Sequence, residues 1–170
     1  CIQKKGGGPR LEERKTGLAP LCPGCARVLV LGSMPSEKSI AAGFYYANPR
    51  NAFWPILAAL YGEADEGTAG GRMARPVFLC LVPRRMGRLL CLVRGRHAEI
   101  NDIPAFLAAH AGIRAVLCNG QASHKLLTRA HPALAVPVRV LPSTSPAAAS
   151  RNFAEKLAAW AAAFDEFSLR

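Results

Sequence analysis

The chain has 170 residues, of which 51% are apolar by a broad count, and a formal net charge of +11. This length is typical of one domain with a real hydrophobic core, and the apolar content excludes a disordered chain. No run reaches the 18 apolar residues of a membrane span, so we expect no membrane partner. The positive charge favours a polyanionic partner, most commonly nucleic acid, although a dispersed excess of surface arginine explains it equally well.

The N-terminal segment, residues 1–16, is charged and Gly-rich and lacks the apolar core of a secretion signal. We interpret it as a flexible basic tail of a cytoplasmic protein, followed by a single domain over residues 17–170. Cys22 and Cys25 form a lone C-x-x-C before a predicted strand. A redox role, or a metal or cluster site with Cys80 and Cys91, is therefore an alternative, although the second C-x-x-C of such sites is absent. We expect no metal and no cofactor.

Four short runs rich in Val, Leu and Ile predict strands that are buried on both faces. They are residues 27–31, 77–82, 115–118 and 138–141. Helical patterns lie between and after them at residues 52–61, 104–111, 121–130 and 147–167. This alternation predicts an α/β fold, a three-layer α/β/α sandwich with a short, mainly parallel four-stranded sheet.

Three of these strands run into polar turns, at residues 32–36, 119–121 and 142–146. In a parallel sheet the carboxyl ends of the strands share one edge, where open α/β folds bind their ligands. The turns are therefore expected to meet although they are far apart in the sequence.

The segment from residue 45 to residue 54, YYANPRNAFW, is dense in aromatic rings and amides. Aromatic rings offer stacking surfaces, amides read the edge of a polar ring, and the guanidinium of Arg50 suits a phosphate. Such a cluster predicts a pocket for a flat polar ring. Two plainer interpretations stay open: Asn51 caps the helix that follows, and Phe53 and Trp54 belong to the core.

Residues 67–98 contain no Asp or Glu and seven Arg. Either this segment is a phosphate-binding arm, or it reflects a frame-shifted stretch of a GC-rich gene. One sequence leaves both explanations open.

These segments together resemble the uracil-DNA glycosylase superfamily, and within it the hypoxanthine (deoxyinosine) branch, sometimes called family 6. The resemblance rests on LGSMPSEKSI at 31–40, YYANPRNAFW at 45–54, NDI at 101–103, CNGQA at 118–122 and LPSTSPA at 141–147. It covers roughly residues 17–164 apart from the middle. It implies a monofunctional enzyme of base-excision repair that flips a deaminated base out of DNA and hydrolyses its bond to the sugar. Hypoxanthine is the expected base, with uracil as a further candidate.

The resemblance also implies roles for individual residues. The branch's essential Asn lies in the block matched by residues 48–51, which implies Asn51 as catalytic, with Asn48 second. Base-binding roles follow for Gly32, Ser33, Met34, Pro35, Tyr45, Tyr46, Phe53 and Asn119. Contacts with the DNA backbone follow for Arg50, Ser143, Thr144, Ser145 and Arg151. The expected partner is double- or single-stranded DNA that contains a deaminated base, and the protein is expected to be a monomer.

The middle of the chain departs from the family pattern. The branch carries a Trp-Asp strand end and an Asp-containing turn there, whereas residues 78–82 are followed by Pro83, Arg84 and Arg85. A catalytically impaired DNA-binding homologue is therefore the alternative function.

Overall fold

The computed structural model describes residues 18, 26–33, 35–62, 79–82 and 102–169, with backbone alone for 79–82. Several predictions lie outside these residues. They concern the tail at 1–16, the C-x-x-C pair, Met34, and the acid-free segment 67–98 apart from its residues 79–82.

A parallel sheet forms the centre of the described structure. Its strands are β1 (Val28–Leu31), β2 (Leu79–Val82), β3 (Ala115–Asn119) and β4 (Val138–Leu141). They lie in the order β2-β1-β3-β4, and each of the three pairings is parallel. The register places Leu31 of β1 beside Cys118 of β3, and Asn119 beside Leu141 of β4. The prediction of a short parallel sheet of four strands is confirmed.

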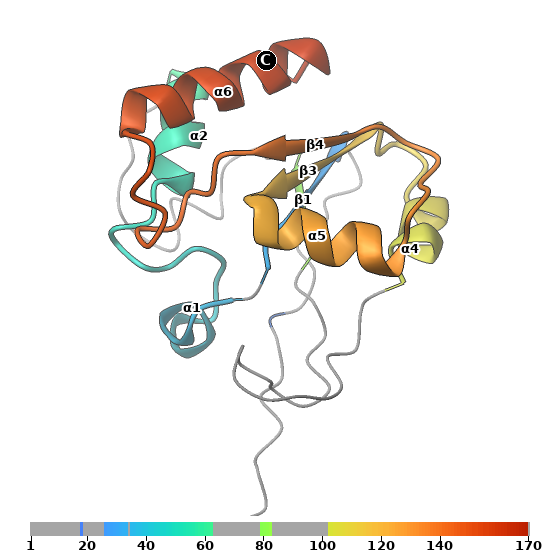
Figure 1. Cartoon of the computed structure of the whole chain (residues 1–170), viewed down its shortest axis with the longest axis horizontal. Coiled ribbons are helices and arrows are strands. Elements are labelled where there is room, and N and C mark those ends of the chain that lie inside the picture. Colours follow the sequence, from blue (N-terminus) through green and yellow to red (C-terminus); the bar gives the residue numbers. More distant parts are fainter. Residues whose placement is uncertain (1–17, 19–25, 34, 63–78, 83–101, 170) are drawn as a thin grey trace, which may run out of the picture.

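Helices cover both faces of this sheet (Figure 1). They are α1 (Glu37–Ala42), α2 (Phe53–Tyr61), α4 (Ile103–Ala109), α5 (Gln121–Ala130) and α6 (Phe153–Glu166). In Figure 1, α2 and α6 lie on one side of the strands, and α4 and α5 lie on the other.

The three layers follow from the alternating directions of side chains along the buried strands. Val28 and Val30 point into a core that contains Trp54 of α2 and Trp160 of α6. Their neighbours Leu29 and Leu31 point into a second core, which contains Ile103 of α4 and Leu127 of α5. Because both faces of β1 are covered, the strand is apolar at every position, as expected for a buried parallel sheet.

The last helix differs from its predicted bounds of 147–167. It starts only at Phe153, because Asn152 takes extended backbone and its side chain accepts a hydrogen bond from the N–H of Glu155 at 2.9 Å. The Glu155 carboxylate in turn accepts from the Asn152 N–H at 2.8 Å, which completes a capping box. Residues 147–152 therefore belong to the loop after β4.

The bounds of the other predicted helices and strands differ from the observed ones by at most two residues. The short helix α1 was not predicted from the sequence patterns. Ser36 caps α1 by accepting a hydrogen bond from the N–H of Ser39 at 3.2 Å. The helix predicted at 104–111 spans Ile103–Ala109 with Asp102 as its cap, one of the two caps considered. The helix predicted at 121–130 has those bounds.

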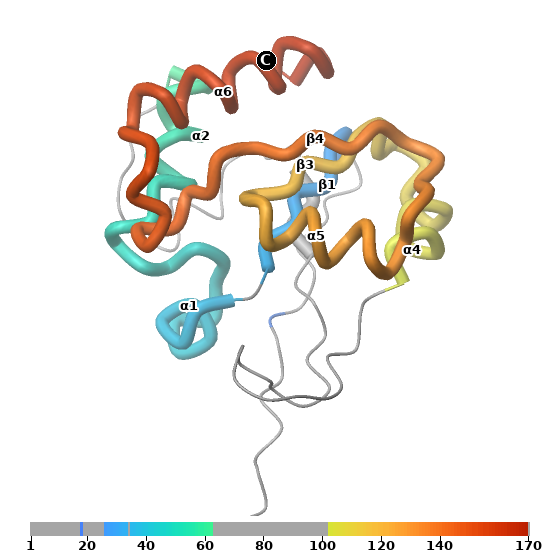
Figure 2. Tube along the Cα trace, viewed as in Figure 1, coloured from blue at the N-terminus to red at the C-terminus, as the bar shows by residue number. Residues whose placement is uncertain are grey.

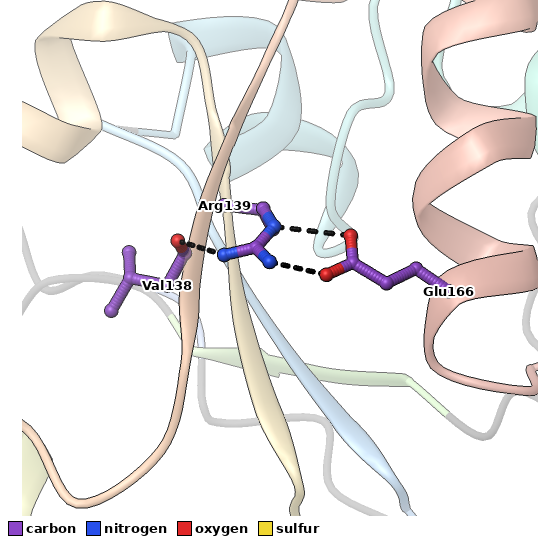
Figure 3. A network of polar contacts seen from close by, with 3 residues as sticks. All are labelled: Val138, Arg139 and Glu166. Atoms are coloured by element: carbon purple, nitrogen blue, oxygen red, sulfur yellow. Dashed lines mark hydrogen bonds and ion pairs between the residues drawn. The ribbon is translucent and has the colours of Figure 1, made fainter.

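An ion pair joins the sheet to the end of α6 (Figure 3). The Arg139 guanidinium on β4 donates through Nε to the Glu166 carboxylate at 3.0 Å, and a second N–H donates to the other oxygen. The same guanidinium lies 5.7 Å from the centre of the Phe167 ring. The carboxylate raises the pKa of Arg139 through hydrogen bonding and charge. Because both side chains are exposed, the pair contributes little to the stability of the fold.

Candidate active site at the carboxyl edge of the sheet

The polar turns after β1, β3 and β4 lie at one edge of the sheet, as their parallel strands require. At this edge Gly120 donates its N–H to the Leu141 carbonyl at 2.9 Å, which ties the end of β3 to the end of β4. Gly120 has φ 96° and ψ 160°, a backbone conformation that only glycine adopts readily. A β-carbon at this position would lie 2.9 Å from the Cβ of Ser143, so the absence of a side chain allows the two loops to touch.

Asn119 is bound to the loop after β4 through both ends of its amide. Its Oδ1 accepts a hydrogen bond from the Thr144 N–H at 2.9 Å, and its Nδ2 donates to Thr144 Oγ1 at 2.8 Å. Both residues are buried. The backbone N–H of Thr144 can only donate, which fixes which end of the amide is the oxygen. The Asn119 side chain therefore holds residues 142–146 against β3.

Tyr46 lies beside this pair with an uncommon backbone. Its φ of 56° is in the left-handed region, which a non-glycine residue seldom occupies. Its hydroxyl comes so close to Gly32 that a β-carbon there would lie 3.1 Å from it. Burial raises the pKa of Tyr46 to about 12, and a hydrogen bond with the Asn119 side chain opposes part of that rise. The phenol thus bridges the ends of β1 and β3 and stays neutral at ordinary pH.

The start of α2 joins the same edge. The N–H of Ala52 donates to the Thr144 carbonyl at 3.0 Å, and Figure 2 shows the chain before α2 running beside the loop after β4. Asn51, one residue earlier, accepts a hydrogen bond from the Phe53 N–H through Oδ1 at 3.0 Å. Asn48 accepts from the Arg50 N–H through Oδ1 at 3.1 Å, and its carbonyl accepts from the Asn51 N–H at 2.8 Å. Each amide oxygen is thereby engaged locally.

The sequence has been compared with known families and structures. A family model described as the Uracil DNA glycosylase superfamily matches residues 19–167. The chain belongs to the uracil DNA glycosylase superfamily.

Two relatives match a short part of the chain. A hypoxanthine DNA glycosylase from Methanosarcina barkeri is 38% identical over 50 residues, which is 29% of this chain and 32% of the relative. A protein of the same name from Methanosarcina acetivorans is 39% identical over 49 residues, 29% of this chain and 31% of the relative. The chain thus matches about a third of the length of each.

A solved structure extends the likeness over nearly the whole fold. It is the solution NMR structure of a Methanosarcina acetivorans protein provisionally described as a uracil DNA glycosylase. It has a TM-score of 0.68 and 25% sequence identity, and the match covers 91% of this chain and 98% of that protein. The uracil-DNA-glycosylase-like fold expected from the sequence is therefore confirmed.

Three residues expected at a glycosylase site meet directly at the edge of the sheet: Gly32, Tyr46 and Asn119. Asn119 has protein partners at this edge: its Oδ1 accepts from the Thr144 N–H, its Nδ2 donates to Thr144 Oγ1, and its side chain hydrogen-bonds Tyr46. A role for Asn119 in reading the edge of a base stays a prediction.

Phe53 lies behind the site. Its ring has 0% exposed surface, stacks against Tyr46 with 4.0 Å between ring centres, and packs edge-on to Trp54 and Trp160. This burial leaves Phe53 no face for a base, which corrects the expectation that it stacks on one. Tyr46 and Tyr45 are partly exposed, and the Trp54 indole donates to the Tyr45 carbonyl at 2.8 Å.

The hydroxyls after β4 engage the backbone of their own loop. Ser143 Oγ accepts from the Ser145 N–H at 3.3 Å, and Ser145 Oγ accepts from the Ala147 N–H at 3.3 Å. Thr144 is buried and binds Asn119, so it shapes the loop from inside, which corrects its expected direct contact with DNA. Arg50 and Arg151 are exposed, whereas Ser33 and Pro35 are partly buried.

Lys156 is a candidate functional residue that the sequence patterns did not reveal. It lies on α6 with 7% of its surface exposed, and its ammonium donates to the Ala148 carbonyl at 2.9 Å. The sequence did contain a signal for the burial of Lys156. This residue precedes Trp160 by one helical turn, so it lies on the same side of α6 as this core residue.

Metal binding and redox chemistry, which the sequence left as alternatives, have little support among the residues that the structure describes. Within that part, no group of three or more His, Cys, Asp or Glu is placed to hold a metal ion. Cys118 is buried, and burial raises the pKa of its thiol to about 11, which disfavours the reactive thiolate. No helix among the described residues is long and apolar enough to cross a membrane.

Proposed function

We propose that this chain is a monofunctional DNA glycosylase that hydrolyses the N-glycosidic bond of a deaminated base in DNA. Hypoxanthine is the first expected substrate and uracil the second. Membership of the superfamily, the names of the two relatives and the net charge of +11 support this proposal. The observation that carries it is the attachment of the Asn51 segment to the edge formed by Gly32, Tyr46 and Asn119.

In the proposed reaction a base leaves the duplex and enters the site beside the tyrosines. Water attacks C1′ of the sugar while the bond from C1′ to the base nitrogen breaks and its electrons stay on the base. The departing base then needs a hydrogen-bond donor and finally a proton. Such donors accelerate the reaction when they are held in place before charge develops.

Asn51 suits the role of a fixed neutral donor. Its Oδ1 is held by the Phe53 N–H, which orients the side chain and leaves Nδ2 as the group available to a substrate. The second lone pair of Oδ1 is suited to orient the attacking water. Asn48 is the second candidate, because its Oδ1 is held in the same way. The structure gives the cap position of α2 to Ala52, which makes no side-chain cap hydrogen bond, so the expectation that Asn51 caps this helix is wrong by one residue. The contact of Asn51 with the Phe53 N–H in the turn before α2 is compatible with a catalytic role.

The test offers the full chain a duplex with one deoxyinosine, and in parallel a duplex with one deoxyuridine. Base release leaves a site that alkali cleaves. We expect cleavage by the unmodified chain and none above background by Asn51→Ala. The matched control is Asn152→Ala, which also removes an amide that accepts from a backbone N–H at a helix start, here that of Glu155 at the start of α6. Equal activity in Asn51→Ala and the unmodified chain would contradict the assignment of Asn51.

A DNA-binding homologue without catalysis is the second candidate. The absence of Asp and Glu from residues 67–98, where the family carries acidic turns, favours it. Salt-sensitive binding of both duplexes without release of either base would support this alternative.

A further inference from the structure

Tyr46 keeps an unfavourable backbone conformation at the edge where the candidate site is assembled. Its φ of 56° costs free energy in a residue that has a β-carbon, and such a conformation persists only where the surrounding structure holds it. The side chain nevertheless has a defined place, because the ring stacks on Phe53 and the hydroxyl lies close to Gly32. The neighbouring peptide groups show how this conformation is held.

The two peptide groups that flank Tyr46 each bind a buried side chain. A peptide group is planar, so the orientation of the group before a residue follows φ and that of the group after it follows ψ. Before Tyr46, the Tyr45 carbonyl accepts a hydrogen bond from the Trp54 indole at 2.8 Å. After Tyr46, the Ala47 N–H donates to Ser39 Oγ at 3.2 Å. The indole therefore restrains φ of Tyr46, and the Ser39 hydroxyl restrains ψ.

Ser39 is a buried polar residue on α1 that has no part in the proposed reaction so far. Its exposed surface is 2%, so little water reaches its oxygen to replace the Ala47 N–H. Its own O–H also needs an acceptor, and Ser36 Oγ lies 3.0 Å away. Ser36 in turn caps α1 by accepting from the Ser39 N–H. The short helix α1 thus presents a fixed hydroxyl oxygen to the segment that joins it to α2 (Figure 1).

We propose that Ser39 is a positioning residue of the candidate active site. Its hydroxyl acts with the Trp54 indole as a clamp that holds Tyr46 in the left-handed conformation. The clamp keeps the phenol beside Gly32 and Asn119. The effect on base release rests on the proposed function, because it takes the site beside Tyr46 as the place that the base enters. Without the Ser39 oxygen the strained backbone relaxes in a fraction of the molecules, and DNA binding has to restore the clamped conformation.

The experiment compares Ser39→Ala, which removes the oxygen and leaves a residue that favours helices, with Ser39→Thr, which keeps a hydroxyl. Base release from a deoxyinosine duplex is followed in single turnovers over a series of concentrations of the full chain. In Ser39→Ala the half-saturating concentration should rise about tenfold, whereas the rate at saturation should change by no more than about twofold, because bound DNA restores the clamp. Ser39→Thr should recover most of the loss.

The matched control for this measurement is Asn152→Ala. It also removes a side-chain oxygen that accepts from a backbone N–H, here at the start of α6. It should leave both the half-saturating concentration and the rate at saturation unchanged. An unchanged half-saturating concentration in Ser39→Ala, or an equal rise in Asn152→Ala, would overturn the role of Ser39 in the site.

A second measurement is independent of base release. Burial raises the pKa of Tyr46 to about 12. In Ser39→Ala, phenolate absorbance should show this pKa moving toward its ordinary value of 10.0, since a ring that leaves its place gains contact with water. A pKa that stays at about 12 in Ser39→Ala would overturn the clamp, whether or not base is released. A shifted pKa in a chain that releases no base would support the clamp and contradict the glycosylase.

Discussion

Asn119 and Thr144 lie 25 residues apart in the chain and form two hydrogen bonds, of 2.8 and 2.9 Å, at the carboxyl edge of the sheet. Both residues are buried, so neither partner is easily replaced by water. Thr144 also accepts a hydrogen bond from Ala52 through its carbonyl. This one contact therefore connects β3, the loop after β4 and the start of α2, three segments from which the candidate site is built.

Asn119→Ala should lower the free energy of unfolding by about 1–3 kcal/mol, because the buried N–H of Thr144 loses its acceptor. Thr144→Val, which removes only the hydroxyl partner, should cost about 1 kcal/mol. Urea unfolding of both variants and of the double variant measures the coupling. Full stability in Asn119→Ala would show that this amide does not hold the loop.

The Tyr46 phenol should titrate near pH 12, above its ordinary value of 10.0, because burial disfavours the phenolate. Since the pKa is raised in the folded state, the associated stability is complete below pH 10 and is lost as the pH rises toward 12. Phenolate absorbance, followed with pH, measures this. Tyr46→Phe should remove the phenolate transition near pH 12 and reduce the loss of stability between these two pH values.

Asn51→Asp separates the role of Asn51 in the turn before α2 from a role in catalysis. The carboxylate still accepts from the Phe53 N–H, so the melting temperature should stay close to that of the unmodified chain. The variant lacks the amide donor and adds a negative charge next to a departing base, so deoxyinosine release should fall at least a hundredfold. Retained activity at full stability would exclude a donor role for Nδ2.

Gly120→Ala should destabilise the fold by more than about 2 kcal/mol. The substitution adds a methyl group 2.9 Å from Ser143 Cβ and imposes a side chain on glycine-only backbone. Gly62→Ala is the matched control, because Gly62 also has positive φ, at 67°, but a Cβ there would meet no atom within 4 Å. It should cost about 1 kcal/mol. Equal urea midpoints for the two variants would contradict the close approach of the loops.

The resemblance of residues 45–54 to one branch of the superfamily was visible from the sequence because its rings and amides are consecutive. The strands were equally visible, since a strand covered on both faces must be apolar at every position, as Val28–Leu31 is. Local patterns could not show which of the clustered rings faces the site. Phe53 and Tyr46 are both aromatic, and only the packing of α2 against α6 buries the first beneath the second.

The sequence by itself determined the parallel α/β fold, the polar turns at one edge and the family, because each follows from residues that are neighbours in the chain. Only the tertiary structure decided how the edge is assembled. The contact of Asn119 with Thr144 depends on the register of β3 and β4, and the burial of Lys156 depends on how α6 packs against the loop before it. Such contacts join residues that are distant in the chain, and their free energy depends on a geometry that no local pattern specifies.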